Sequence, residues 1–316
     1  MDGGLVWTAA LFALGVALVV KGGGWFLEGA VWLAEATGLP RFVIGATVVS
    51  LATTLPELTV SATGVLKGQV DLAVGNAVGS VAANLGLILG LSALFVPGGA
   101  DRRQFAGKAG LMLLALALLQ TLCRGGEVTA IGGAILLAVF SAYVWLSLRD
   151  ARDGREAQRQ PITRRQLSEK GLRFLLGLGA IIGGSQLLVD HGGDLALALG
   201  VPAGVIGVTL VAVGTSLPEL VTTVTAIRRR EGAMSVGNII GANVIDLTLI
   251  LPVCALLSGG RLTVSRQTAV LDLPVCLLLG AAAMAPPLMK GRFARWQGAA
   301  LLGLYGAYLL LVTLAE

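Results

Sequence analysis

Residues 45–58 read GATVVSLATTLPEL, an apolar stretch that also carries hydroxyl groups, a proline and a carboxylate. The stretch lies within an apolar segment long enough to cross a lipid bilayer. On a helix, Ser50, Thr54 and Glu57 follow one another at spacings of four and three residues, so they share one face. Pro56 has no backbone N–H to donate, so we expect the helix to bend beside these oxygen-bearing side chains.

The rest of the chain is also apolar. Of its 316 residues, 55% are hydrophobic and only 13% are charged, and the mean hydropathy is +0.85. A soluble domain usually has about 25% charged residues. Apolar runs of about 18 residues or more recur throughout, so we predict an all-α membrane protein. The net charge of +5 comes from basic residues in short loops between these runs, which argues against a nucleic-acid partner.

The apolar runs predict ten membrane-spanning helices. Their ranges are 5–34, 42–66, 71–95, 105–122, 128–148, 168–196, 205–227, 233–257, 267–285 and 295–314. The segment 149–166 is hydrophilic and separates two halves of five helices each, 1–148 and 167–316. We therefore predict two five-helix repeats joined by a linker.

Lysine and arginine residues set the predicted orientation. If the N-terminus lies outside, the cytoplasmic loops and helix ends hold 18 of the 23 basic residues and the opposite side holds 4. Cytoplasmic loops of membrane proteins carry an excess of lysine and arginine. We therefore predict that both termini lie outside and that the 149–166 linker is cytoplasmic, in a plasma membrane or a bacterial inner membrane.

The opening stretch has a second copy. GVTLVAVGTSLPEL at 207–220 aligns with it at an offset of 162 residues, and the same offset aligns GNAVGSVAAN at 75–84 with GNIIGANVID at 237–246. A constant offset indicates a duplication. Since each half has an odd number of spans, the copies enter the membrane in opposite directions. Such inverted repeats are a common transporter architecture, with the substrate site near the midplane where the halves meet.

The repeated polar residues offer only oxygen ligands. Thr215, Ser216 and Glu219 repeat the hydroxyl and carboxylate pattern in the second copy. The neighbouring helices add Asn76, Ser80 and Asn84 in the first copy, and Asn238, Ala242 and Asp246 at the equivalent positions of the second. Hard cations such as Ca²⁺ bind about six to eight oxygen atoms. Carboxylates inside a membrane are costly and usually functional, so we interpret Glu57 and Glu219 as the centre of a cation site.

The two copies, each followed by a GN…G helix, resemble the two alpha repeats of the sodium/calcium exchanger family, within the cation/calcium exchanger superfamily. The resemblance covers essentially the whole chain and points to a prokaryotic type. It implies alternating access, in which Ca²⁺ and Na⁺ compete for overlapping sites in the second, third, seventh and eighth helices. The first and sixth helices would slide across the others as a gate, and the family implies no cofactor beyond the transported ions.

The resemblance also implies the ligands, by motif position. They are Glu57 and Glu219 for both ions; Thr53, Thr54, Thr215 and Ser216 through hydroxyl or backbone oxygens; Ser50 and Ala212 through carbonyls; and Ser80, Asn84 and Asp246. The family usually reads GS-N after the second glycine of each copy. Here the first copy has Val81 in place of the asparagine, and the second has Ala242 in place of the serine. We therefore expect one monovalent-ion site to lack a ligand.

We predict an antiporter that exchanges Ca²⁺ for Na⁺. The alternative is an H⁺-coupled exchanger of Ca²⁺ or another divalent cation, because the three carboxylates can also carry protons. A channel is disfavoured because the buried carboxylates are discrete and no continuous polar stripe joins them. An intramembrane hydrolase would need a nucleophile–base pair, and no histidine lies near the serines of the motifs, so we predict no enzymatic activity.

Overall fold

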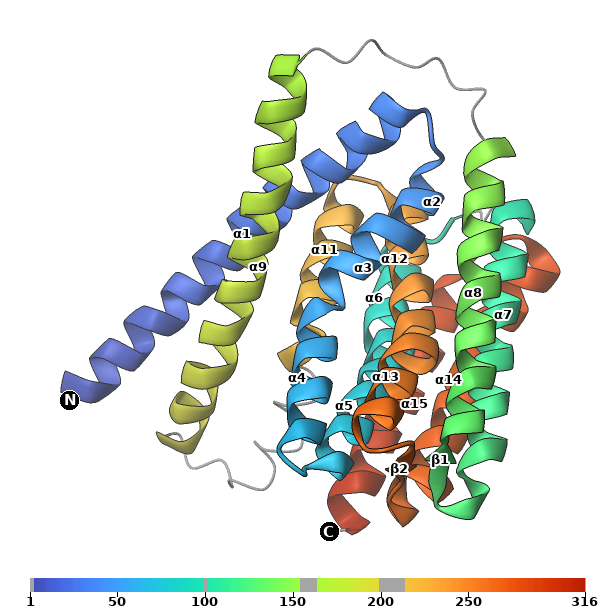
Figure 1. Cartoon of the computed structure of the whole chain (residues 1–316). Coiled ribbons are helices and arrows are strands. Elements are labelled where there is room, and N and C mark those ends of the chain that lie inside the picture. Colours follow the sequence, from blue (N-terminus) through green and yellow to red (C-terminus); the bar gives the residue numbers. More distant parts are fainter. Residues whose placement is uncertain (1–2, 99–101, 154–163, 199–213, 316) are drawn as a thin grey trace.

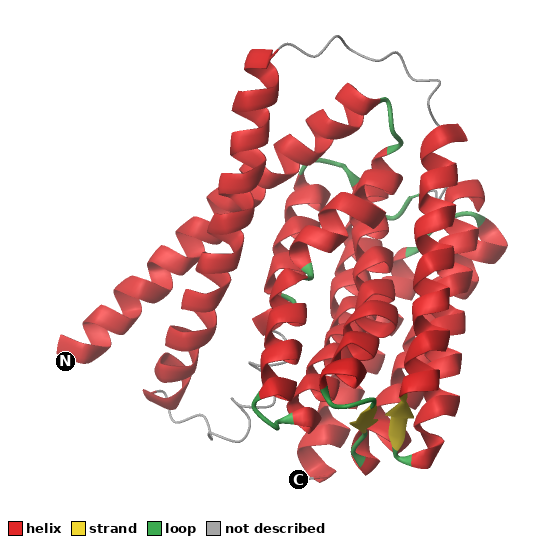
Figure 2. Ribbon diagram, viewed as in Figure 1, coloured by secondary structure: helices red, strands yellow, loops and turns green. Residues whose placement is uncertain are grey.

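A computed structural model describes residues 3–98, 102–153, 164–198 and 214–315. Nearly all of these residues are helical (Figures 1 and 2). In this part of the chain, eight helices are long and apolar enough to span a membrane, and the bent pair Arg41–Thr53 and Leu55–Leu66 makes a ninth. The predicted seventh span, 205–227, lies partly outside the described residues, so ten spans remain a prediction.

In the first half, the second and third predicted spans are interrupted helices, and the other three are continuous. Its elements are α1 (Gly3–Thr37), α2 (Arg41–Ile44), the π-helical turn η1 (Gly45–Val49), α3 (Ser50–Thr53), α4 (Leu55–Leu66), α5 (Val70–Ala83), the π-helical turn η2 (Asn84–Ile88), α6 (Leu89–Phe95), α7 (Arg102–Leu122), the 3₁₀ turn η3 (Cys123–Gly125), β1 (Glu127–Thr129) and α8 (Ala130–Asp153).

The second half follows a similar order. Its elements are α9 (Arg164–Ala198), α11 (Leu217–Arg228), α12 (Gly232–Ile245), the π-helical turn η4 (Asp246–Ile250), α13 (Leu251–Leu257), β2 (Arg261–Thr263), the π-helical turn η5 (Thr268–Asp272), α14 (Leu273–Lys290) and α15 (Arg295–Ala315).

Two features differ from the sequence-based expectation. The fold is not purely helical, because β1 and β2 pair as a two-stranded antiparallel sheet in which Val128 lies opposite Leu262. Strands of three residues are too short to show a period-two pattern. In addition, α8 and α9 extend into the predicted linker 149–166. The residues that follow the fifth span, up to Asp153, include neither glycine nor proline, so nothing local ends α8 at the membrane boundary.

Equivalent elements of the two halves have matching bounds. The helices α4 and α11, α5 and α12, and α6 and α13 each begin and end 162 residues apart. Thr54, before α4, has φ −83° and ψ 1°, and its equivalent Ser216, before α11, has φ −83° and ψ 6°. In the view of Figure 1 the chain descends along α4 and ascends along α11. The repeat seen in the sequence is therefore also a repeat of local conformation.

The bend predicted beside Pro56 is confirmed. Pro56 and Pro218 occupy the first turns of α4 and α11, where a missing N–H costs little. Thr54 leaves the helical conformation, and the axes on either side of it differ by 41°. The second span therefore consists of two helical pieces that meet at its hydroxyl-rich segment.

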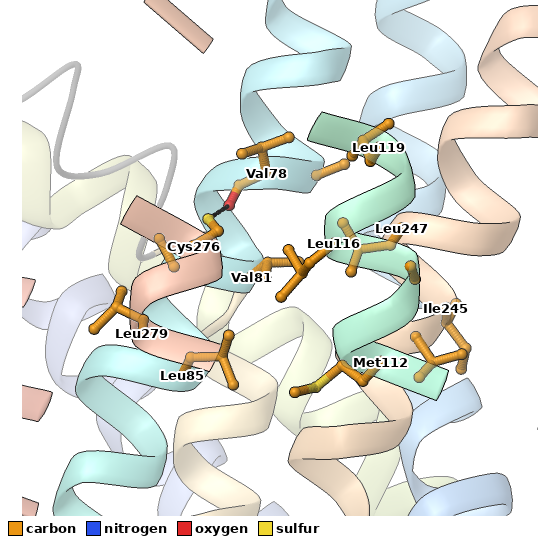
Figure 3. Close-up of a cluster of buried hydrophobic side chains, with 14 of the residues drawn as sticks. Val78, Val81, Leu85, Met112, Leu116, Leu119, Ile245, Leu247, Cys276 and Leu279 are labelled. Atoms are coloured by element: carbon orange, nitrogen blue, oxygen red, sulfur yellow. Dashed lines mark hydrogen bonds between the residues drawn. The ribbon is translucent and has the colours of Figure 1, made fainter. Parts of the chain in front are cut away.

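The main core surrounds the repeated helices. In the apolar windows of Val70–Phe95 and Gly232–Leu257, 72% and 83% of the residues are buried, the largest shares among the described spans. Figure 3 shows part of this core, where Val78 and Val81 of α5 pack near Leu116 of α7. The Cys276 thiol donates to the Val78 carbonyl at 3.5 Å. All three cysteines are buried and free.

The helices α1 and α9 form a separate unit at one side of the molecule (Figure 1), called here the α1–α9 pair. A Cβ atom at Gly15 would lie 3.0 Å from the Gly184 carbonyl oxygen, and one at Gly22 would lie 2.9 Å from the Gly177 carbonyl oxygen. The backbones are thus in direct contact, which small residues permit between membrane helices. Only 11% and 22% of the residues in the apolar windows of the two helices are buried, so most of the surface of the pair is exposed.

Candidate cation-binding site

The acidic residues of the two repeats lie in the interior of the helix assembly. Glu57 at the start of α4, Glu219 at the start of α11 and Asp246 at the start of η4 are fully buried. Glu57 lies close enough to Glu219 and Asp246 for electrostatic repulsion between the carboxylates. The other predicted ligands that the structure describes are Ser50, Thr53, Thr54, Ser80, Asn84 and Ser216, all buried, and Thr215, which is half-buried. Ala212 lies outside the described residues.

These buried groups largely lack hydrogen-bond partners. Among the described residues, both carboxylate oxygens of Glu57, Glu219 and Asp246 are unpartnered, as are the Ser216 hydroxyl and both polar atoms of the Asn84 amide. A buried polar group without a partner is costly, and a buried charge far more so. The arrangement therefore fits a positively charged ligand held by oxygen atoms.

Hydrogen bonds between the two halves position the motif hydroxyls. The Thr53 hydroxyl donates to Asn238 Oδ1 of α12 at 3.3 Å. In the equivalent bond the donor lies in the second half and the acceptor in the first: the Thr215 hydroxyl donates to Asn76 Oδ1 of α5 at 3.0 Å. The sequence counted these two asparagines among the oxygen-bearing residues of the motifs, but the ligand set that the family resemblance implies does not include them. Their place in the repeated GN motif was the available signal, and the structure assigns them to holding the hydroxyls.

The same asparagines are fixed by neighbouring helices. Asn76 Nδ2 donates to the Ser61 hydroxyl at 3.0 Å and to the Glu57 carbonyl at 3.3 Å, both in α4. Asn238 Nδ2 donates to the Thr222 hydroxyl of α11 at 3.1 Å. Each amide oxygen is thereby left facing the other half of the molecule. The amide nitrogens thus join α4 with α5 and α11 with α12, and the amide oxygens join the two halves around the acidic residues.

Three of the π-helical turns lie beside this site. Asn84 begins η2 and Asp246, its equivalent, begins η4, while η1 precedes Ser50. π-Helical turns are rare and frequently occur at functional sites. The wider turn changes the direction of a side chain and alters the regular hydrogen bonding of the backbone carbonyls. Apolar periodicity did not predict these turns, since a single widened turn leaves the hydrophobic pattern of a buried helix unchanged.

The Ser50 carbonyl, a predicted ligand, is already engaged. It accepts hydrogen bonds from the Thr54 N–H at 3.0 Å and from the Thr54 hydroxyl, and the Thr53 hydroxyl lies 3.4 Å away. The Ser50 hydroxyl donates to the Thr47 carbonyl at 3.1 Å. A cation that uses the Ser50 carbonyl must therefore compete with the Thr54 hydroxyl, which can turn away because it rotates freely about one bond.

The two departures from the family pattern have different surroundings. Ser80 lies 3.3 Å from the Thr215 hydroxyl, so its position belongs to the site, and Ala242 is its equivalent in α12. Val81 packs in the apolar core near α7 (Figure 3). Its equivalent, Asn243, donates to Met112 Sδ of α7 at 3.7 Å. Position 81 therefore faces away from the carboxylates, and the methyl group of Ala242 is the departure that concerns the site.

The donor set defines the chemistry open to this site. It consists of carboxylate, hydroxyl, amide and carbonyl oxygens, which suit Ca²⁺ and small alkali ions. Among the described residues, no group of three or more histidine, cysteine, aspartate or glutamate side chains converges as a metal cluster. A cation here would take carboxylate oxygens together with neutral oxygens of the motif.

Comparison with known proteins agrees with this arrangement. The family model of the sodium/calcium exchanger protein matches residues 7–149 and 171–314. The inner membrane protein YrbG of Escherichia coli is 37% identical over 265 residues, covering 80% of this chain and 81% of YrbG. The sodium/calcium exchanger MaX1 of Methanosarcina acetivorans is 28% identical over 342 residues, covering 96% and 97%.

A solved structure matches over nearly the full length. It is the sodium-calcium exchanger NCX_Mj soaked with 2.5 mM Na⁺ and 10 mM Sr²⁺, with a TM-score of 0.84, 30% sequence identity and 99% of each chain covered. The arrangement of apolar helices is thus shared along the whole chain. The family match over both halves, together with this structural agreement, shows that the protein belongs to the sodium/calcium exchanger family of membrane proteins.

Proposed function

We propose that the protein is a cation antiporter that exchanges Ca²⁺ for Na⁺ across the membrane by alternating access. The observation that carries this proposal is the pair Glu57 and Glu219, which lie buried and without hydrogen-bond partners among the described residues, at equivalent positions of two broken helices. Two carboxylates can offset the charge of one divalent cation or of separate monovalent ions. Relatives named as sodium/calcium exchangers support the same assignment.

We assign the ligands by combining the motif with the contacts described above. Glu57 and Glu219 would bind both ions, and Asp246 would compensate additional charge. The neutral ligands would be Ser50, Thr53, Thr54, Ser80, Asn84, Ala212, Thr215 and Ser216, through hydroxyl, amide or carbonyl oxygens. The transported ions are substrates, and no cofactor enters the mechanism.

The proposed transport cycle uses two inverted repeats, residues 1–148 and 167–316, each with five spans. The matching bounds of α4 and α11, and their opposite directions in Figure 1, support this arrangement. The α1–α9 pair would slide across the remaining helices to expose the site alternately to either face. We place both termini outside and the 149–166 linker in the cytoplasm of a plasma membrane or bacterial inner membrane.

Proton coupling is the alternative, and Ala242 favours it. A hydroxyl oxygen is missing where the first half has Ser80, so one Na⁺ would be poorly coordinated. A proton needs no coordination shell and binds to a single carboxylate oxygen. The three buried carboxylates are therefore sufficient for H⁺ exchange, whereas Na⁺ exchange also needs the neutral ligands.

Transport by purified protein in liposomes tests the proposal. Uptake of radioactive Ca²⁺ is measured with an imposed Na⁺ gradient, with an imposed H⁺ gradient and with neither. We expect uptake to be driven by the outward Na⁺ gradient and to saturate with Ca²⁺ concentration. Uptake driven only by H⁺ would select the alternative, and absence of uptake under both gradients would contradict Ca²⁺ antiport.

A further inference from the structure

An ion pair joins the α1–α9 pair to the end of α11, on the face that we assign to the cytoplasm. Glu28 of α1 contacts Arg229, which directly follows α11, with 3.0 Å between Oε1 and Nη2. The same carboxylate contacts Arg173 of α9 at 3.3 Å. The contact with Arg173 lies within the α1–α9 pair, whereas the contact with Arg229 links that pair to the helices that carry the candidate site.

The repeat gives the Glu28–Arg229 ion pair a counterpart at the opposite face. The offset of 162 residues takes Glu28 to Asp190 of α9 and takes Arg229 to Lys67, which directly follows α4. The charges keep their signs at both positions. Lys67 and Arg229 also have nearly the same backbone conformation, with φ −89° and ψ 4° against φ −94° and ψ 4°.

The counterpart pair is not formed in this structure. Asp190 accepts a hydrogen bond from Gln186, one turn earlier on α9, at 2.9 Å. Lys67 is exposed. Within the described part of the chain, neither residue takes part in an ion pair. The two faces of the molecule, although equivalent in sequence, are therefore in different states.

The two faces also differ in helix packing, which is close on the face that holds the Glu28–Arg229 ion pair and open on the opposite face. On the face with the ion pair, α1 packs closely against α11. A Cβ atom at Gly23 of α1 would lie 2.8 Å from atoms of both Val221 and Thr225. This close contact leaves no room for a passage between the two helices.

The equivalent helices at the other face, α9 and α4, are separated by a cavity of about 190 Å³. Val60 of α4 and Gln186 of α9 line it, together with Thr215, whose hydroxyl bonds to Asn76 in the candidate site. Ser185 of α9 also lines it. The Ser185 hydroxyl is buried and has no hydrogen-bond partner among the described residues. The cavity thus extends from α9 to the candidate site on the face that carries Lys67 and Asp190.

We propose that Asp190 and Lys67 form an ion pair in a second conformation, in which α9 closes onto α4 and Glu28 separates from Arg229. The inference rests on the proposed function, because alternating access requires two conformations of the same helices. In a pair of inverted repeats, each half can adopt the arrangement that the other half shows. The described structure is then open to the outside, and the exchange of ion pairs accompanies the change to the inward-open form.

The contacts within the α1–α9 pair couple the formation of the Asp190–Lys67 ion pair to the separation of Glu28 from Arg229. Because the backbones of α1 and α9 touch along their glycines, the helices move together, and one contact is lost as the other is made. In the second conformation Ser185, the equivalent of Gly23, would face Thr59 and Thr63, the equivalents of Val221 and Thr225. Their hydroxyls offer partners to the Ser185 hydroxyl, which lacks one in the present structure.

The modest strength of these two ion pairs allows the protein to change readily between the two conformations. Glu28 and Arg229 retain 32% and 40% side-chain exposure, and partly exposed ion pairs shift an equilibrium by about fivefold or less. A single strong pair on one face would trap the protein in one state. One weak pair on each face gives both states a similar contact, so that the bound ions decide the balance.

Crosslinking between cysteines tests the proposal directly. The double variants Glu28→Cys/Arg229→Cys and Lys67→Cys/Asp190→Cys are made in a background without native cysteines, with a protease site placed in 154–163. A short bifunctional thiol reagent is used, because long ionic side chains hold backbones further apart than a disulfide permits. After proteolysis in detergent, a crosslink keeps the two halves together on a gel.

We expect both pairs to crosslink, and a change from Na⁺ to Ca²⁺ to alter their yields in opposite directions. Either crosslink should stop ion exchange in liposomes. The matched control is Glu28→Cys/Arg173→Cys, which joins two residues of the moving unit and should leave exchange running. Absence of the Lys67→Cys/Asp190→Cys crosslink, when the other two form, would overturn the proposal.

Charge reversal gives a second measurement. Lys67→Asp and Asp190→Lys should each change the yield of the Glu28→Cys/Arg229→Cys crosslink by about two- to fivefold, and the combined variant should restore it. No restoration would contradict a direct contact. The Lys67→Cys/Asp190→Cys crosslink can form whichever ion the protein carries, so a protein that fails to exchange Ca²⁺ would refute the proposed function and still report on the second conformation.

Discussion

The Ser80 hydroxyl of α5 lies 3.3 Å from the Thr215 hydroxyl at the broken helix of the other half. The equivalent pair is Ala242 and Thr53, in which only one partner has a hydroxyl. The candidate site therefore has matching backbones in the two halves and different ligands. This difference makes the site asymmetric, and it leads to the first prediction.

Ala242→Ser should raise the apparent affinity for Na⁺ or steepen the Na⁺ dependence of Ca²⁺ exchange. The added hydroxyl would lie near Thr53 and supply an oxygen to a dehydrated ion. A contact to a charge of about 1.5 kcal/mol corresponds to about a tenfold change in affinity. The measurement is a Na⁺ titration of Ca²⁺ exchange, with Ca²⁺ affinity measured in parallel and expected to change little.

Ser80→Ala is the matched variant in the other half and should weaken the Na⁺ dependence. If this variant changes the titration while Ala242→Ser leaves its slope and midpoint unchanged, the two positions are not equivalent. The proposed missing ligand would then be wrong. A water molecule beside Ala242 would reduce the gain from the serine, because an alanine leaves room for one.

Glu57→Gln and Glu219→Gln should each reduce Ca²⁺ exchange by about 100-fold or more. Removing one charge leaves a buried divalent ion poorly compensated, and the loss of one partner of a buried ionic contact costs about 3–5 kcal/mol. The yield of folded protein should fall little, because a neutral amide is cheaper to bury than a carboxylate.

The control for the glutamate variants is Glu127→Gln. Glu127 lies in β1 and pairs with Arg261 at 3.6 Å, away from the candidate site. Its replacement should leave exchange near the wild-type rate. Wild-type exchange in Glu57→Gln or in Glu219→Gln would remove the basis of the proposed site.

The asparagines that link the two halves should act together with their threonine partners. Asn238→Ala removes the acceptor of the Thr53 hydroxyl, and we expect exchange to fall by about tenfold. A double-mutant cycle with Thr53→Val measures the coupling, which should be clearly non-additive. The same cycle for Asn76→Ala and Thr215→Val should give a similar coupling energy. Additive effects in both cycles would contradict a positioning role.

Gly177→Val should disrupt the contact between α1 and α9. A Cβ atom at this position would lie 2.8 Å from the Gly22 carbonyl oxygen, and closer still to the backbone of Phe26. The control is Gly179→Val on the same helix, where a Cβ atom meets nothing within 4 Å among the described residues. We expect the first variant to lose thermal stability or exchange activity and the second to retain both. Equal behaviour of the two variants would show that the close contact is dispensable.

The orientation can be measured by cysteine labelling. Glu169→Cys on α9 should react with an impermeant thiol reagent only from the cytoplasmic side, and Arg124→Cys after α7 only from outside. The native cysteines are buried and should give little background. The reverse pattern would overturn the predicted orientation and would leave the repeat unaffected.

The sequence by itself determined the membrane class, the duplication and the residues of the candidate site. Apolar length fixes the spans, since a bilayer admits only segments whose backbone is satisfied internally. The constant offset between the LPEL and GN motifs identified the two halves, and the structure repeats it in the bounds of α4 and α11. Glu57 and Glu219 stood out because carboxylates are rare in such segments.

Tertiary structure decided which polar groups meet. The bond between Thr53 and Asn238 joins residues 185 positions apart, and no local pattern encodes such a contact. The π-helical turn at Asp246 and the short β1–β2 sheet were also invisible, because their local sequence fits an ordinary helix or loop as well. The different states of the two faces depend on how α1 and α9 pack across the other helices. One repeated sequence is compatible with either arrangement, so only the packing of the whole chain selects which face holds the ion pair and which holds the cavity.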